Sequence, residues 1–397
     1  MLSPHAQQGF SLLQAGKADD GIRAFKEGLQ ADPRDVDCLL GLARVALIKG
    51  LPDEAKPFLA QITMLQPLHA EAGSHLALIR FMGGDKSALA HLRQATITPT
   101  AGAFEFMNLA RALGRSGDNA ASEVAYKRAV LLDPKNAFIR MEAGDAALAR
   151  GDGPSAVAHF GAAVESAPHE YILVAHLAKA HAVNGDIPKA AEWMQKAIDI
   201  APLEPALREE MYLLRMRTGD HAGALAQVEE LLKRAPEEPQ YRYWKGVSLI
   251  RLCRLEDAKV EFESVVAARP KASDARQALA DVYAQLKDYP RAQKLLEEAL
   301  QLDPTSAPAA IDLSNLLFEK GAPGKAQAEK VLRQALVSHP EEPALHFNLA
   351  VALASSDKKK ALDHAQKSVA FSRPDWGVRA EAERLVQALS APPQGKP

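Results

Sequence analysis

Proline recurs at a nearly constant interval along this 397-residue chain, and this period constrains the fold more than any other feature. Successive gaps range from 32 to 36 residues, and most are 34 residues. A fixed period of this length predicts one supersecondary unit repeated in tandem. Such an array grows by stacking its units, so the chain length does not imply several globular domains. The eleven prolines are Pro33, Pro67, Pro99, Pro134, Pro168, Pro202, Pro236, Pro270, Pro304, Pro340 and Pro374.

A glycine about 17 residues before most of these prolines divides each unit into two short helices. Glycine adopts the left-handed conformation that ends a helix, and the next proline closes the second helix. In the eighth and ninth units Cys253 and Lys287 replace this glycine. The third unit is two residues short, and the tenth carries two extra residues, so both are expected to be irregular. The hairpin glycines are Gly16, Gly50, Gly84, Gly117, Gly151, Gly185, Gly219 and Gly321.

Small and bulky apolar residues alternate at fixed places within each unit. The first helix carries a large residue followed by a small one, and Gly9, Gly144 and Gly246 take the small place in three units. The second helix carries an alanine, a bulky residue four positions later and a small residue three positions after that. These spacings put the residues on one helical stripe, where small side chains let helices approach closely. The sixth unit shows the whole set: Leu177-Ala178, Gly185, Ala190, Met194, Ala197 and Pro202.

This set of marks resembles the tetratricopeptide repeat, over eleven units that span residues 2–374. The resemblance implies an all-α fold, a right-handed α-solenoid superhelix of stacked antiparallel helix hairpins. Pentatricopeptide repeats have a similar length, but they bind RNA and tend to be basic, whereas this chain has a formal net charge of −2. Asp375 is expected to cap a last helix over residues 375–389, which closes a single domain over residues 1–389. The tail 390–397 is expected to be disordered.

Composition limits the partners and the compartment of this chain. A net charge of −2 gives no field that would attract a polyanion, so we expect no nucleic-acid partner. Cys38 and Cys253 lie six units apart, too far for a disulfide in a solenoid, and are expected to be free thiols. The start lacks a basic region followed by an apolar one, and no run of about 18 apolar residues occurs. We therefore expect a cytoplasmic protein without a membrane span.

The sequence contains no motif for catalysis, for a cofactor or for a metal. There is no dinucleotide fingerprint, no Gly-x-Ser-x-Gly elbow and no His-Glu-x-x-His pair among the twelve histidines. The stretch from Gly83 to Ser87 resembles a phosphate loop, but Asp85 interrupts it and a polar hairpin turn explains it. We therefore expect no enzyme activity, no cofactor and no metal site.

In the tetratricopeptide family the first helices line a concave face, where peptides or helices often bind. At the positions expected to face the concave side, units three to five carry phenylalanine and methionine side chains that could make adaptable apolar contacts with a partner. The alternative is that these side chains only pack against the adjacent first helix. The same positions also carry cationic points that could hold a carboxylate, unless these are only solvated. Asn108 and Arg111 give a fragment of the carboxylate clamp of chaperone-binding members, and the clamp is incomplete. The candidate partner-binding residues are Arg44, Phe81, Met82, Phe104, Met107, Asn108, Arg111, Arg115, Met141, Lys179, Arg217, Tyr243 and Arg251.

These observations favour a non-enzymatic interaction scaffold that binds a protein or peptide segment on its concave face. One alternative is a recruitment or accessory subunit of a separate enzyme, such as a transferase. Another is a self-assembling structural protein, since open repeat edges can stack when the terminal units are poorly capped. The sequence leaves the oligomeric state and the identity of the partner open.

Overall fold

A computed structural model describes residues 2–14, 17–99 and 101–391. Within these ranges the chain forms 23 α-helices and no strand, which confirms the all-α helical repeat fold. The predicted turn at Gly16 lies outside the described residues, as do residues 392–397 of the predicted tail. The chain divides into two compact units, residues 1–214 and 215–397. The single domain expected from the sequence stays a prediction.

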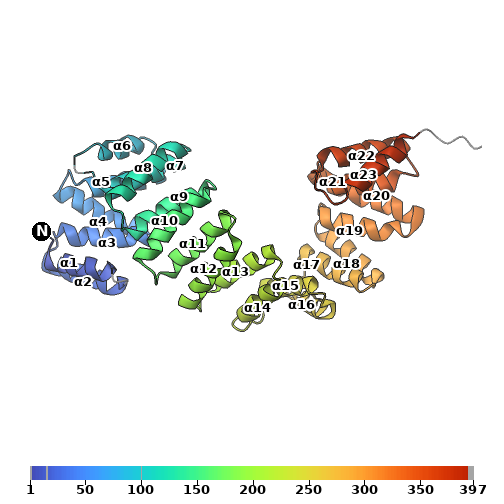
Figure 1. The fold of residues 1–397 in the computed structure, drawn as a ribbon, viewed down its shortest axis with the longest axis horizontal. Helices are drawn as coiled ribbons and strands as arrows, with labels where there is room; N and C mark the ends of the chain where they lie inside the picture. The colour runs from blue at the N-terminus through green and yellow to red at the C-terminus, as the bar shows by residue number, and fades with distance from the viewer. Residues whose placement is uncertain (1, 15–16, 100, 392–397) are drawn as a thin grey trace, which may run out of the picture. The chain divides into compact units, whose positions relative to one another are not determined.

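Unit 1 is a run of helix hairpins in which each first helix packs against the second helix that follows it (Figure 1). Second helices also contact the first helix of the next hairpin, so the hairpins stack. The helices are α1 (Pro4–Gln14), α2 (Ala18–Ala31), α3 (Val36–Ile48), α4 (Pro52–Leu65), α5 (Ala70–Met82), α6 (Ala88–Thr96), α7 (Ala103–Arg115), α8 (Asn119–Leu132), α9 (Ala137–Ala149), α10 (Gly153–Ser166), α11 (Tyr171–Val183), α12 (Ile187–Ile200) and α13 (Pro205–Thr218), which contains the unit boundary.

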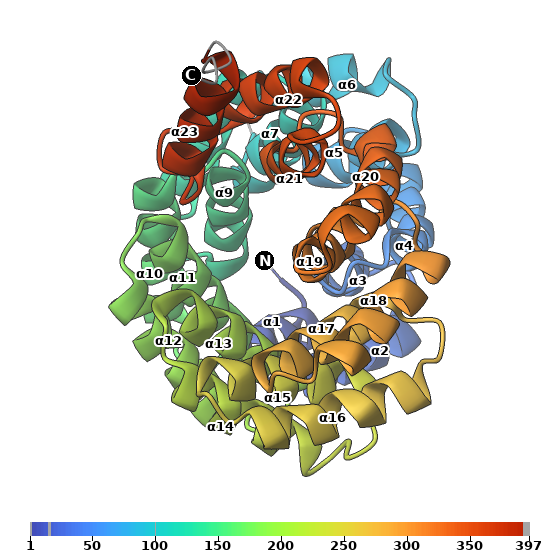
Figure 2. The ribbon, with the colours of Figure 1, turned by 90° about the vertical axis from the view of Figure 1, so that its right-hand side faces the viewer.

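Unit 2 repeats the same arrangement, and Figures 1 and 2 both place its last helices α21, α22 and α23 together. Here α22 packs against both α21 and α23, so α23 covers the open side of the last hairpin. The helices are α14 (His221–Leu232), α15 (Pro239–Arg251), α16 (Leu255–Ala268), α17 (Ser273–Gln285), α18 (Tyr289–Leu302), α19 (Ala307–Phe318), α20 (Gly321–Ser338), α21 (Pro343–Leu353), α22 (Lys358–Phe371) and α23 (Arg379–Ser390).

The turns inside the hairpins follow the predicted chemistry. Every hairpin glycine in the described ranges has a positive φ, between 68° and 102°. Cys253 and Lys287 take the same conformation, with φ values of 57° and 64°. An aspartate follows many of these turns and caps the second helix by accepting a hydrogen bond from its third backbone N–H. These aspartates are Asp118, Asp152, Asp186, Asp220 and Asp288.

The core is a series of clusters along the stack, as expected for a solenoid. Phe160 is fully buried in one such cluster, with Ala156 and Ala163 of the same helix. A Cβ atom added at Gly144 of α9 would lie 2.7 Å from the Phe160 ring, so only glycine fits there. The small place of the first helix is therefore set by the bulky residue of the second helix, as the sequence predicts.

The two units of unusual length have unusual second helices. In the short third unit α6 has only 9 residues, whereas α4 and α8 each have 14. In the long tenth unit α20 has 18 residues, because the extra residues extend the helix at its start. A change in repeat length is thus absorbed by the second helix and leaves the first helix at its usual length.

The predicted start of the last helix was wrong, since α23 begins at Arg379 and not at Asp375. Residues 373–379 instead form two successive turns, closed by hydrogen bonds from Trp376 N to Arg373 O and from Arg379 N to Trp376 O. Gly377 lies within the second turn, and glycine disfavours helix. The Trp376 ring meets Phe347 of α21 edge-on, at a centroid distance of 6.3 Å.

Candidate functional site

Unit 1 contains two adjoining cavities of about 650 and 980 Å³ that share Asp133 and Asn136 in their walls. Together we call them the turn groove, because turns between repeats and the starts of first helices supply most of the lining. The smaller cavity is lined by Arg44, His69, Ala70, Glu71, Gly102, Ala103, Phe104, Glu105, Leu132, Asp133 and Asn136. The larger is lined by Leu13, Ile48, Asp133, Pro134, Lys135, Asn136, Ala137, Phe138, Arg140, Ala162, Glu165, Ser166, Ala167, Glu170 and Leu173.

Arg44 of α3 and Glu71 of α5 form a two-pronged ion pair at one wall of the smaller cavity. Arg44 Nε and Nη2 donate to the two carboxylate oxygens of Glu71, each at 2.7 Å. The guanidinium carbon also lies 4.5 Å from the centroid of the Phe104 ring and 5.5 Å from that of Phe10. The charge of Arg44 is therefore paired with Glu71, and the Phe10 and Phe104 rings lie near its guanidinium group. These contacts fix the side chain in the wall of the cavity.

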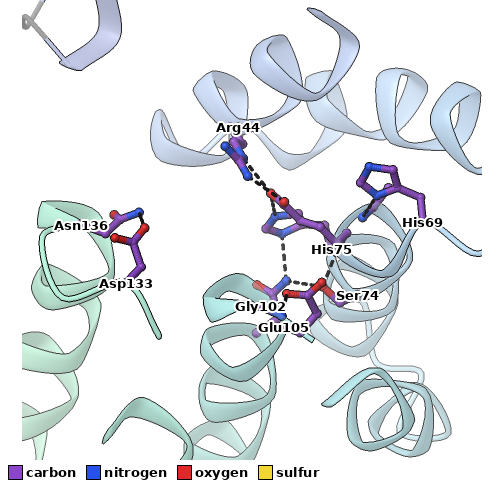
Figure 3. Close-up of polar contacts among 11 residues, drawn as sticks. Arg44, His69, Ser74, His75, Gly102, Glu105, Asp133 and Asn136 are labelled. Carbon is purple, nitrogen blue, oxygen red and sulfur yellow. Dashed lines mark hydrogen bonds and ion pairs between the residues drawn. The ribbon is translucent and has the colours of Figure 1, made fainter. Parts of the chain in front are cut away.

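A chain of polar contacts continues from Glu71 into the interior (Figure 3). Asn108 Nδ2 donates to His75 Nδ1 at 3.0 Å and to Ser74 Oγ at 2.9 Å. Because an amide nitrogen only donates, His75 Nδ1 accepts, and the ring proton sits on Nε2, 3.6 Å from Glu71 Oε1. Burial would raise the pKa of Glu71, but the nearby His75 and the two hydrogen bonds from Arg44 outweigh it and lower the pKa to about 2.

Glu105 of α7 is a buried carboxyl group on the opposite side of this chain. It accepts a hydrogen bond from Gly102 N at 3.1 Å, which caps the start of α7; Gly102 has no side chain to return the bond. Burial raises the pKa of Glu105, and the neighbouring Glu71 charge raises it further. Figure 3 shows Asp133 and Asn136 across the cavity from this group, where Asn136 Nδ2 donates to Asp133 Oδ2 at 2.8 Å. No basic side chain forms an ion pair with Glu105 among the described residues.

Further along unit 1, contacts between a carboxylate and a basic side chain or an imidazole join successive first helices. Each contact links one first helix to the first helix of the next repeat, 31 residues later. Burial raises the pKa of Glu142, although Arg111 beside it lowers that pKa. The contacts are Arg111 with Glu142 at 3.2 Å, Asp145 with His176 at 2.9 Å, and Lys179 with Glu210 at 2.9 Å.

Two corrections to the predicted site follow. Arg44, Arg111 and Lys179 were expected to offer their charge to a partner, but each is already paired with a carboxylate of the next repeat. Met107 and Asn108 were expected on the surface, but both are buried. Asn108 contacts Ser74 and His75 of the preceding first helix, and Met107 lies in a core cluster, so a partner cannot reach either side chain.

The remaining predicted residues are accessible to different degrees. Phe81, Phe104 and Met141 are partly buried and pack on the core, and Tyr243 meets Phe262 edge-on at a centroid distance of 5.4 Å. Exposed side chains are Met82, Arg115, Arg217 and Arg251. Of all thirteen predicted residues, the turn groove includes only Arg44 and Phe104.

The sequence does contain a signal for the groove residues that were missed. His69, Asn136 and Glu170 each lie two residues after a repeat proline, at the N-cap of α5, α9 and α11. Polar residues at this place read as ordinary helix caps. Asn136 and Glu170 become walls of the larger cavity only because they lie near Ile48 and Leu13, which are distant in the sequence. His69 becomes a wall of the smaller cavity together with Asp133, which is also distant in the sequence.

Two sequence profiles described as tetratricopeptide repeat match this chain. Their matches together span more than half of its length. One covers residues 107–170, 141–205, 213–262 and 311–375, and the other covers 12–79, 254–298 and 283–329. The chain is a tetratricopeptide repeat protein. No curated protein sequence gives a significant match.

Solved structures of similar fold include other tetratricopeptide repeat proteins. One from Parabacteroides merdae is 18% identical, with 64% of this chain and 98% of that chain covered and a TM-score of 0.50. The C-terminal part of one from Cytophaga hutchinsonii is 15% identical, with 60% and 99% covered and a TM-score of 0.52. Yeast Tom70 is 13% identical, with 97% and 94% covered and a TM-score of 0.50. At these identities the likeness concerns the fold alone.

A helix that spans a bilayer needs about 20 mostly apolar residues. Across the ranges that the structure describes, no helix of this tetratricopeptide repeat protein combines the length and the apolar character needed to cross a membrane.

Proposed function

We propose that this protein is a non-enzymatic scaffold that binds a segment of a partner protein along its concave face, with the turn groove as the main contact of unit 1. The observation that carries this proposal is the groove itself, two adjoining cavities of about 650 and 980 Å³ with apolar and charged walls. Sites for extended segments combine apolar contacts with a few placed polar groups. The absence of a nucleic-acid partner and a cytoplasmic location belong to the same proposal.

The ordered wall around Arg44 supports recognition rather than catalysis. Arg44 is fixed by Glu71, and Phe104 lies against it at the mouth of the cavity. Glu71 has a pKa near 2 and therefore stays ionised, so it is a poor general base at neutral pH. A preformed wall of this kind lowers the loss of freedom on binding.

The experiment is recovery of partners from the native host with the tagged full chain and its variants. Phe104→Ser removes the aromatic wall of the groove, and we expect it to reduce recovery of the specific partner by about tenfold or more. Val337→Ser is the matched control, because Val337 is an exposed apolar residue of α20, outside the groove. Met107→Ser is unsuitable, because it would disrupt the core.

Circular dichroism and thermal unfolding establish that both variants are folded. Equal recovery by wild type, Phe104→Ser and Val337→Ser would remove the groove as the binding site.

A further inference from the structure

The turn groove carries more carboxylates than basic side chains. Arg44 is held by Glu71, and Arg140 Nε donates to the carbonyl of Pro134 at 2.6 Å, so both guanidinium groups are already directed at partners within the protein. The carboxylates are Glu71, Glu105, Asp133, Glu165 and Glu170, and the basic residues are Arg44, Lys135 and Arg140.

Two of these carboxylates lie at the C-terminal ends of helices, where helix electrostatics does not favour them. Asp133 is the C-cap of α8, and Glu165 lies in the last turn of α10. The C-terminal end of a helix carries partial negative charge, so it does not stabilise an acidic side chain there. Neither helix has a basic residue in its last turn to offset this effect. Asp133 accepts a hydrogen bond from Asn136, whereas helix electrostatics gives no reason for the charge of Glu165.

The positive ends of neighbouring helices do not cancel the acidic character of the groove. The N-terminus of α9 follows the C-terminus of α8 after a short turn, and α11 follows α10 in the same way. Each turn thus combines one positive and one negative helix end, and the two partial charges largely offset each other. The electrostatic potential in the groove is therefore set mainly by the formal charges of its side chains, among which carboxylates are in excess.

Apolar side chains lie beside these carboxylates. Ile48 is 52% exposed and Leu132 is 40% exposed, and Phe138 is half-buried. Exposed large apolar residues beside unneutralised carboxylates match a segment that carries both aliphatic and cationic groups.

We propose that the turn groove recognises a basic segment of a partner protein, in which Lys or Arg side chains meet Asp133 and Glu165 while apolar side chains rest on Ile48, Leu132 and Phe138. This inference rests on the proposed scaffold function and adds the chemistry of the partner. Binding of this kind weakens as salt rises, because the groove is open to solvent.

The test uses fluorescence anisotropy with the full chain and labelled 12-residue peptides. One peptide consists of Lys-Leu-Ser repeats, and the other has Glu in place of Lys. We expect saturable binding of the Lys peptide that weakens with salt, and much weaker binding of the Glu peptide. The double variant Asp133→Asn, Glu165→Gln is expected to weaken binding of the Lys peptide by about tenfold.

This variant also separates recognition from folding. Asp133→Asn keeps an acceptor for Asn136, and neither acid is stabilised by its helix end, so the unfolding temperature is expected to stay close to that of wild type. Thermal unfolding of the variant checks this. The matched control is Asp53→Asn with Glu237→Gln, two exposed acids outside the groove, which should bind like wild type. Equal binding of both peptides, or unchanged binding by the groove variant, would overturn the basic-segment inference. If Phe104→Ser still loses the cellular partner in that case, the scaffold proposal stands and only the chemistry of the partner is wrong.

Discussion

His346 and His364 hold their Nδ1 atoms 2.9 Å apart across the α21–α22 hairpin. His346 Nε2 lies 2.9 Å from the carbonyl oxygen of Pro340, which can only accept, so Nε2 carries the ring proton. Nδ1 of a neutral His346 is then an acceptor, and His364 Nδ1 must donate. The two rings are stacked with centroids 5.2 Å apart. The last hairpin thus contains a hydrogen bond that requires both imidazoles to be neutral or only His364 to be charged.

We expect the last hairpin to lose stability as the solution becomes acidic. Burial lowers the pKa of His364 from 6.5 to about 4, and the neighbouring His346 lowers it as well. Between these pH values the unfolded chain binds more protons, so stability falls as pH falls. His364 is half-buried, and solvent screening limits the loss to about 1–2 kcal/mol between pH 7.5 and 5.

Chemical denaturation at several pH values measures this loss. His364→Gln should be less sensitive to pH than wild type, whereas His91→Gln, which alters an exposed histidine of α6, should behave like wild type. Identical pH profiles for wild type and His364→Gln would disprove the role of the imidazole pair.

A second electrostatic prediction concerns two carboxylates on neighbouring first helices of unit 2. Burial raises the pKa of Asp312, and Asp281 raises it further, while a hydrogen bond from Gln277 at 3.0 Å opposes both. The folded state therefore binds the proton better, so this site destabilises the protein at neutral pH and stability recovers as pH falls toward 3.8. Asp312→Asn keeps an acceptor for Gln277 and should raise the unfolding free energy at pH 7 by about 0.5–1 kcal/mol.

The comparison variant is Asp53→Asn, which removes an exposed acid of α4 and should change little. A loss of stability in Asp312→Asn would mean that the charge itself is needed in the folded protein.

The ion pairs between successive first helices of unit 1 show which contacts the sequence could have predicted. The contacts of Arg111 with Glu142 and of Lys179 with Glu210 both span 31 residues, so opposite charges at this spacing could have been found beside the 34-residue period. Each basic residue was considered without the helix that faces it. Arg111 and Lys179, which form ion pairs within the protein, were therefore predicted to bind a partner. The groove is harder to predict, because it needs Ile48 beside Asp133, and repeat periodicity does not give the curvature that brings them together.

Features set within one repeat were predicted better than which side of each first helix is accessible to a partner. The hairpin turns, the small places such as Gly144 and the lengths of the irregular units follow from residue chemistry within one repeat. The prediction that Met107 is accessible was wrong, because an inward position and a buried position can be neighbours in the sequence. Successive residues of a helix differ by a rotation of only about 100° around its axis. Small rotations between hairpins decide which of the two faces a partner, and the sequence does not specify them.

The two non-glycine turns predict stabilising substitutions. Cys253 and Lys287 adopt left-handed backbone conformations, with φ values of 57° and 64°, which strain any residue with a Cβ atom. Lys287→Gly should raise the unfolding free energy by about 0.5–1 kcal/mol, since relief of strain exceeds the added entropy of the unfolded chain. Lys287→Ala is the control, because it removes the charge and keeps the strain. If Lys287→Ala raised the unfolding free energy as much as Lys287→Gly, the gain would come from loss of the lysine side chain and not from relief of backbone strain.

Two glycines in the same hairpin should respond to alanine in opposite ways. At Gly144 a Cβ atom would lie 2.7 Å from the buried Phe160 ring, so Gly144→Ala overpacks the contact and should cost about 1–3 kcal/mol. At Gly161 of α10 no atom lies within 4 Å of an added Cβ, so Gly161→Ala should gain up to about 1 kcal/mol from helix propensity. Urea unfolding of both variants measures the difference. Phe160→Leu should reduce the cost of Gly144→Ala in a double-mutant cycle, because the two residues are in contact. Additive effects would show that the close approach of α9 and α10 is not what selects glycine at position 144.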